Sequence, residues 1–251
     1  MKTFTIGKKK IVLKEEWMVG FITTWIVGLL AHAYRFFNFL PIWDSIYNFT
    51  GVGSTYTLGR WFLGYAGLIT SMFDLPWVNG AFSLFYISIV VILLTEMFEI
   101  KNKGMIVLCA AIFVSFPTVV SSFAYMYTAD AYLLAFLLAT LAVYLTWCVK
   151  KWGTIAGMVC LAFAMGIYQA YATVAIVLVL LYIIRQFVIE KLDFLEAVRK
   201  DLKYLGMLVG GAVLYAVILK ITLIRYNITL PGYQGIGALG IMSLGQYKAA
   251  L

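Results

Sequence analysis

Long runs of hydrophobic residues alternate with short polar connections along most of this chain. A helix needs roughly 17 to 25 such residues to cross the hydrocarbon core of a bilayer. Seven stretches meet that length: residues 17–38, 79–98, 104–121, 130–149, 152–168, 171–188 and 204–224. We therefore expect an all-helical membrane protein with about seven transmembrane helices. We treat residues 1–251 as a single transmembrane domain.

Two hydrophobic stretches allow more than one number of crossings. Residues 153–187 contain no charge until Arg185, and as one helix they would extend about 52 Å against a hydrocarbon core of about 30 Å. Two helices that turn near the motif YQAY fit better. Residues 61–73 could be an eighth crossing, but they would span only about 20 Å. We expect an interfacial or re-entrant helix there.

Composition supports this class, because 64% of the residues are hydrophobic and only 12% are charged, far from the usage of soluble domains. The net charge of +8 comes from short basic runs between the hydrophobic stretches. Orientation in a membrane explains such runs, so we expect no nucleic-acid partner. The three cysteines stand singly in hydrophobic stretches, and neither a disulfide framework nor a metal site is predicted.

With seven crossings, most basic residues fall on the side that holds the N-terminus. They are Lys2, Lys8, Lys9, Lys10, Lys14, Lys101, Lys103, Lys150, Lys151, Arg185, Lys191, Arg199, Lys200 and Lys203. Basic residues concentrate in cytoplasmic loops. We therefore expect a multi-pass protein of the lipid bilayer with a cytoplasmic N-terminus.

The outer side then holds the segment PIWDSIYNFTGVGSTYTLGRWFLG, residues 41–64. Ionisable groups at membrane depth are costly, so they are candidates for function. A carboxylate such as Asp44 can accept the proton of a sugar hydroxyl. An arginine such as Arg60 can bind a phosphate through charge-assisted hydrogen bonds. Together they suit a glycosyl transfer in which a lipid phosphate is the leaving group.

Other outer residues are candidates for binding the substrate. They are Arg35, Trp61, Tyr127, Asp130 and Gln169. Aromatic rings with a polar edge can stack on sugars, and an amide can bond sugar hydroxyls. Arg35 lies one helical turn after His32, on a face that could approach Asp44.

Each candidate also has a structural alternative. Asp44 and Asp130 could cap the helices that begin near them, and Arg60 could extend to lipid headgroups. The aromatic residues could form an interfacial belt. Gln169 could bond between helices.

The layout resembles the bacterial membrane glucosyltransferases of O-antigen conversion, the type II glucosyltransferase family of the GT-C superfamily. The residues that carry the resemblance are WDSIYNFTG and LGRWFLG after the first span, SSFAYMYTADAYLLAFLLA at the next outer loop, and GIYQAY in the hairpin. It implies a GT-C-like helical bundle in a bacterial inner membrane.

The resemblance also implies a reaction. A sugar, expected to be glucose, would pass from a polyprenyl-phosphate donor to an extracytoplasmic glycan or lipid-linked glycan, with inversion at the sugar carbon. By position, Asp44 would be the catalytic acidic group, Arg60 the phosphate contact and Asp130 a second polar group of the same site. Many related enzymes present two adjacent acids here, whereas Trp43 precedes Asp44 and Ser45 follows it.

Three points stay open at this stage. Family members are commonly longer, so the chain is either the N-terminal part of a longer GT-C enzyme or a shortened relative; its end on the outer side favours the first. No cofactor is identified, and a divalent metal is left undetermined because some GT-C enzymes use one. The alternative function is a polytopic transporter or flippase for a lipid-linked or small solute, although neither internal repeats nor matching broken spans are evident.

Overall fold

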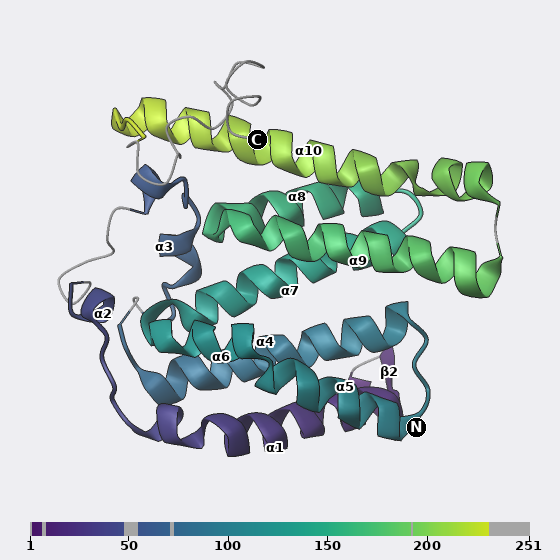
Figure 1. Cartoon of the computed structure of the whole chain (residues 1–251), viewed down its shortest axis with the longest axis horizontal. Helices are drawn as coiled ribbons and strands as arrows, with labels where there is room; N and C mark the ends of the chain where they lie inside the picture. The colour runs from purple at the N-terminus through teal and green to yellow at the C-terminus, as the bar shows by residue number, and fades with distance from the viewer. Residues whose placement is uncertain (1, 7–8, 48–54, 71–72, 192, 231–251) are drawn as a thin grey trace.

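The computed structural model describes residues 2–6, 9–47, 55–70, 73–191 and 193–230. Its long helices lie roughly side by side across the view of Figure 1, and their connections gather at two ends. The bounds of these helices are α1 (Glu15–Phe37), α4 (Pro76–Met97), α5 (Lys103–Ser115), α7 (Met126–Cys148), α8 (Gly153–Ile167), α9 (Ala172–Arg185) and α10 (Phe194–Tyr226). The predicted helical framework is confirmed.

Shorter elements connect these helices. They are α2 (Trp43–Tyr47), the 3-10 helix η2 (Tyr56–Leu58), α3 (Leu63–Ala66), α6 (Pro117–Ser122), the 3-10 helices η3 (Phe123–Tyr125) and η4 (Gln169–Tyr171), and the π-helix η5 (Gln186–Glu190). We call the end of the bundle that carries α2 and α3 the α3 end, and the end where α1 begins the basic end (Figure 1).

An antiparallel hairpin precedes α1 and was not predicted. It pairs β1 (Lys2–Ile6) with β2 (Lys9–Leu13), and Lys2 lies opposite Leu13. Both strands are rich in the β-branched and aromatic residues that favour strands, in the sequences KTFTI and KKIVL. The chain is thus helical except for this hairpin in its described part.

Five stretches of the described residues are long and apolar enough to cross a membrane: Glu15–Phe37, Pro76–Met97, Lys103–Cys148, Gln169–Ile189 and Arg199–Tyr226. Gly153–Ile167 is apolar but shorter. The protein is therefore a membrane protein, and the number of seven crossings stays a prediction.

The 46-residue stretch Lys103–Cys148 is not one straight helix. Phe116 has extended backbone angles before Pro117, so the helix breaks there. The rings of Phe113 and Phe136 lie 5.5 Å apart, whereas a continuous helix would separate these positions by about 35 Å. The chain therefore folds back near η3, and α5 and α7 run in opposite directions (Figure 1).

The interfacial helix expected at residues 61–73 is not observed in the described part of that range, where only the single turn α3 is helical. Gly64 lies within this turn and Gly67 follows it directly, and glycine is a poor helix former. Trp61 and Leu63 are only 7% and 3% exposed, because they pack against the bundle. Tyr65, Leu68 and Ile69 of the same segment are more than half exposed, so the expectation was wrong in the length of the helix, while part of the segment does present hydrophobic side chains outward.

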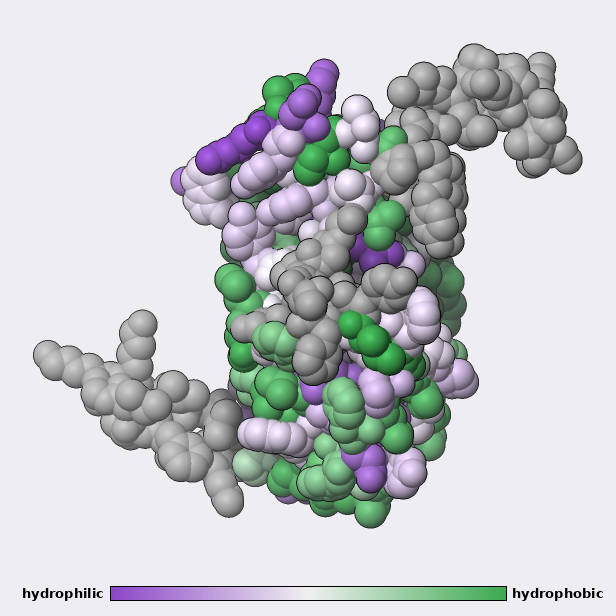
Figure 2. Space-filling model, turned by 90° about the vertical axis from the view of Figure 1, so that its left-hand side faces the viewer, coloured by the Kyte–Doolittle hydropathy of each residue, from purple (hydrophilic) through white to green (hydrophobic). Residues whose placement is uncertain are grey.

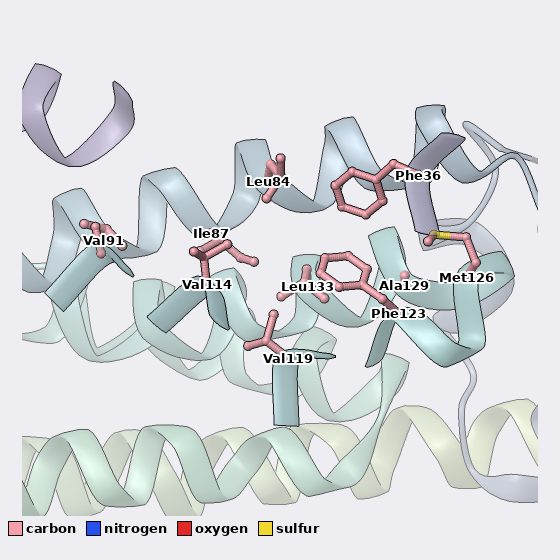
Figure 3. Packing of buried hydrophobic residues seen from close by; sticks show 11 residues of the cluster. Phe36, Leu84, Ile87, Val91, Val114, Val119, Phe123, Met126, Ala129 and Leu133 are labelled. Carbon is pink, nitrogen blue, oxygen red and sulfur yellow. The ribbon is translucent and has the colours of Figure 1, made fainter. Parts of the chain in front are cut away.

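The largest hydrophobic cluster lies between α1, α4, α5, α6 and α7 (Figure 3). It includes Phe36, Leu84, Ile87, Val114 and Phe123, each at most 3% exposed. The Phe36 and Phe123 rings meet edge to face at 5.1 Å, an arrangement that aromatic pairs favour. This packing fixes the C-terminal end of α1 against the turn that precedes α7.

Glycines let the helices approach closely, as is usual in membrane bundles. A Cβ atom on Gly157 of α8 would lie 2.7 Å from the carbonyl oxygen of Ala142 in α7. A Cβ atom on Gly211 of α10 would lie 2.8 Å from the Leu161 side chain. Thus α8 packs tightly between α7 and α10.

Ion pairs close the opposite, basic end of the bundle. Lys14 contacts Glu96 at 2.7 Å, and Arg185 contacts Glu99 at 3.2 Å. The indole of Trp17 also donates to Glu96, at 2.6 Å. These contacts join α1 and α9 to the C-terminal end of α4.

Candidate functional site

A short turn places Arg60 at the α3 end of the bundle. The 3-10 helix η2 ends at Gly59, whose φ of 73° lies in the left-handed region that favours glycine. The backbone N–H of Arg60 then donates to the carbonyl oxygen of Thr55 at 2.8 Å. The sequence therefore needs a glycine immediately before the arginine.

Side chains from η4 and α10 hold this turn. Nε2 of Gln169 donates to the carbonyl oxygen of Leu58 at 2.8 Å and to the hydroxyl of Tyr215 at 2.9 Å. The Tyr215 hydroxyl donates to the carbonyl oxygen of Gly59 at 3.0 Å. The backbone before Arg60 is thus tied to two other parts of the bundle.

The guanidinium of Arg60 lies among tyrosine side chains. Its central carbon is 4.4 Å from the centre of the Tyr168 ring, and Nη1 donates to the Tyr132 hydroxyl at 3.1 Å. The two tyrosine rings stack on one another with centres 5.4 Å apart. Nε of Arg60 is buried, and among the described residues it has no hydrogen-bond partner and Arg60 takes part in no ion pair. The group therefore keeps the capacity to bind an anion.

Asp44 lies on the exposed surface of the short helix α2. It is the second residue of that helix, and the Ser45 hydroxyl accepts the hydrogen bond from the backbone N–H of Ile42. Tyr127, at the start of α7, is 9% exposed and lies within electrostatic range of both Asp44 and Arg60. The structure therefore brings Asp44, Tyr127 and Arg60 to one region of the α3 end.

Arg35 has several protein partners at this end. Its Nε donates to the carbonyl oxygen of Phe123 at 2.8 Å and its Nη2 to that of Ala124 at 3.2 Å, while Nη1 donates to that of Leu40. Nη2 also lies 3.9 Å from the Asp74 carboxylate. These contacts join the end of α1 to the turn before α7, so Arg35 has a structural role.

Asp74, two residues before the start of α4, is a buried acid. Its side chain is 4% exposed, and neither carboxylate oxygen has a hydrogen-bond partner within the part of the chain that the structure describes. Burial raises the pKa of Asp74, and the positive charge of Arg35 opposes that rise.

Asp130 is 2% exposed and lies inside α7. Its carboxylate accepts hydrogen bonds from Nδ2 of Asn79 at 3.0 Å and from the Thr70 hydroxyl at 3.3 Å. Asn79 in turn accepts from the backbone N–H of Leu75 at 2.9 Å. Asp130 thus joins α7 to α4 and to the chain after α3, and its predicted role in the site stays a prediction.

Trp61 and Gln169 also make contacts with other residues of the bundle. The Trp61 ring packs edge to face on Phe163 at 5.3 Å, and a Cβ atom on Gly166 would lie 2.7 Å from it. Gln169 holds the turn before Arg60, as described above. Two tyrosines around Arg60 were not named as candidates: Tyr132 lies in the quoted motif two residues after Asp130, and Tyr215 lies in α10 with no motif around it.

Viewed end-on, this end of the molecule mixes hydrophilic with hydrophobic residues (Figure 2). Within the described ranges, no group of three or more histidine, cysteine, aspartate or glutamate side chains could hold a metal ion. In this arrangement Arg60 can bind an anion, and the exposed carboxylate of Asp44 can accept a proton. Such a pair suits a transfer reaction whose leaving group is negatively charged.

Comparison with known proteins identifies the family. The family model described as Glucosyl transferase GtrII matches residues 33–250, which include every candidate residue named above. No curated protein and no solved structure matches the chain. Because the family model covers most of the chain, this protein belongs to the GtrII glucosyl transferase family.

Proposed function

We propose that this membrane glucosyltransferase transfers a glucosyl unit from a polyprenyl-phosphate donor to a glycan at the α3 end of its bundle. We place the α3 end outside the cytoplasm and the basic end inside, in a bacterial inner membrane. The distribution of basic residues supports this orientation, because Lys14, Lys103 and Arg185 all lie at the basic end.

The observation that carries the proposal is the environment of Arg60. Its guanidinium is partly buried, rests on the Tyr168 ring and bonds the Tyr132 hydroxyl, with Nε unpartnered. A phosphate at this position would gain charge-assisted hydrogen bonds that water screens only in part. A negatively charged leaving group would gain more from them as the reaction proceeds than the bound donor does.

Asp44 is proposed as the general base. It is exposed, so a glycan acceptor can reach it from the aqueous side. In the step, the acceptor oxygen bonds the anomeric carbon while the bond from that carbon to the phosphate oxygen breaks. The electron pair leaves with the phosphate, and Asp44 accepts the acceptor proton. Attack opposite the leaving group inverts the anomeric carbon.

Tyr127 is proposed to lie between donor and acceptor, since both Asp44 and Arg60 act on its hydroxyl electrostatically. Arg35, Asp130, Trp61 and Gln169 are proposed to support the site through the protein contacts described above. Their side chains would then affect substrate binding through the positions of α1, α4 and the Arg60 turn.

The test is glucosyl transfer by the purified protein in lipid vesicles supplied with polyprenyl-phosphate-glucose and a lipid-linked glycan. Wild type should transfer glucose, and Asp44→Asn should bind the donor yet transfer at least about a hundredfold more slowly, as expected for loss of a general base. Equal rates would remove Asp44 from the mechanism. Movement of the donor across the bilayer without transfer would instead identify a flippase.

A further inference from the structure

The peptide immediately before Arg60 is bound by side chains from two other parts of the chain. The carbonyl oxygen of Leu58 accepts from Gln169 at 2.8 Å, and that of Gly59 accepts from Tyr215 at 3.0 Å. Gln169 and Tyr215 also bond each other, at 2.9 Å. Two successive carbonyl groups are therefore fixed by one connected pair of side chains.

The fit around this turn is close. A Cβ atom at residue 59 would lie 2.6 Å from Nε2 of Gln169 and 2.8 Å from the Tyr215 hydroxyl. Gly59 is thus required both by its positive φ and by the approach of these two side chains. A larger residue would displace the turn from the side chains that hold it.

The same region of the chain supports the arginine side chain. Tyr168, whose ring lies 4.4 Å from the guanidinium carbon, directly precedes Gln169. Farther along α10, Tyr226 stacks on Tyr56 of η2 with ring centres 5.2 Å apart. The turn before Arg60 therefore contacts α10 at two places. The guanidinium of Arg60 packs on Tyr168, the residue next to Gln169.

We propose that Tyr215 is a positioning residue, whose hydroxyl, together with Gln169, sets the place of the Arg60 guanidinium for binding the donor phosphate. This inference rests on the proposed function in one respect, that Arg60 contacts the donor. It assigns α10 a part in the reaction, because Tyr215 belongs to that helix. Because this hydroxyl already bonds Gly59 and Gln169, we expect acceptor binding not to depend on it.

The test is Tyr215→Phe, which removes the hydroxyl and keeps the ring. Of the two hydrogen bonds that the hydroxyl makes, the bond to Gly59 acts directly on the Arg60 turn. Loss of one ordinary hydrogen bond corresponds to about a fivefold change, so kcat/KM for the donor should fall by at least about that factor while KM for the acceptor stays unchanged. Tyr204→Phe is the matched control, because it makes the same change in α10 about 16 Å along the helix, toward the basic end. Its donor kinetics should equal those of wild type.

A double-mutant cycle separates positioning from general destabilisation. If Tyr215 acts through Arg60, Tyr215→Phe should have no further effect in an Arg60→Gln background. Gln169→Met, which removes the amide donors at similar length, should behave in the same way. Equal losses in both backgrounds, or donor kinetics in Tyr215→Phe equal to wild type, would overturn the proposal.

A separate readout keeps this inference distinct from the proposed function. Binding of polyprenyl phosphate alone should weaken about fivefold in Tyr215→Phe. If wild type binds the lipid but transfers no glucose, the proposed reaction fails while the positioning role is still decided by this binding. If wild type neither binds the lipid nor transfers glucose, both proposals are wrong.

Discussion

The guanidinium carbon of Arg60 lies 4.4 Å from the centre of the Tyr168 ring. A cation over a tyrosine face gains about 0.5 to 2 kcal/mol, depending on how far water is excluded. This contact holds the arginine without neutralising its charge, unlike a carboxylate partner. The guanidinium of Arg60 can therefore still bind a phosphate.

Removal of the Tyr168 ring should weaken donor binding. Tyr168→Leu is expected to raise KM for the donor several-fold, because the cation–π contact supplies about 0.5 to 2 kcal/mol. Tyr168→Phe should stay close to wild type, since the ring face remains. Steady-state kinetics with varied donor concentration measures both, and equal values for the two variants would contradict the role given to the ring.

Asp74 should make stability depend on pH. Its pKa is raised from the ordinary value of 3.8 by burial, so the stabilising effect of its neutral form is complete below 3.8 and is lost as pH rises through the raised pKa. Asp74→Asn stays neutral. Its apparent Tm in detergent should therefore gain on wild type across the pH range above about 4. A difference that is constant across this range would mean that Asp74 is not desolvated.

Close packing of α8 against α7 should make Gly157 intolerant of a methyl group. The added Cβ would meet the backbone carbonyl oxygen of Ala142 at 2.7 Å, and backbone cannot move aside as a flexible side chain can. Gly157→Ala should cost about 1 to 3 kcal/mol of stability. Gly206→Ala, where nothing lies within 4 Å, is the matched control and should be neutral or slightly stabilising. Thermal unfolding compares the two.

Orientation in the membrane can be tested with single cysteines. Asn38 is exposed at the α3 end, and Lys103 is exposed at the basic end. In right-side-out vesicles, a membrane-impermeant thiol reagent should label Asn38→Cys above the level of wild type and should not label Lys103→Cys. The opposite pattern would reverse the proposed orientation and place the site in the cytoplasm.

The long helices could be predicted because hydrophobic length largely determines them, and α1 and α4 follow the expected stretches closely, whereas α10 begins ten residues before the expected stretch 204–224. The hairpin at 153–187 was also predicted correctly, since a single helix would greatly exceed the bilayer thickness. The helix expected over residues 61–73 was not observed, because some hydrophobic residues of this segment pack against other helices in a way that no local pattern reveals. Trp61, for example, packs on Phe163 of α8.

The site was predictable only in part. Asp44 and Arg60 stand out because charged residues are scarce on that side of the chain. The contacts that surround Arg60 join Gly59, Gln169 and Tyr215, and such pairing depends on how distant helices pack. Arg35 illustrates the converse: its charge marked it for substrate, whereas it bonds the carbonyl oxygens of Phe123 and Ala124.

The central claim is that Arg60 binds the phosphate of a polyprenyl-linked sugar. The most direct measurement is the affinity of wild type and of Arg60→Gln for polyprenyl phosphate in lipid nanodiscs, with the neutral polyprenol as the comparison ligand. A charged hydrogen bond contributes about 1.5 to 3 kcal/mol, so the variant should bind the phosphate roughly ten- to a hundredfold more weakly. Its affinity for the neutral polyprenol should match that of wild type. Unchanged affinity for the phosphate in Arg60→Gln would contradict the account.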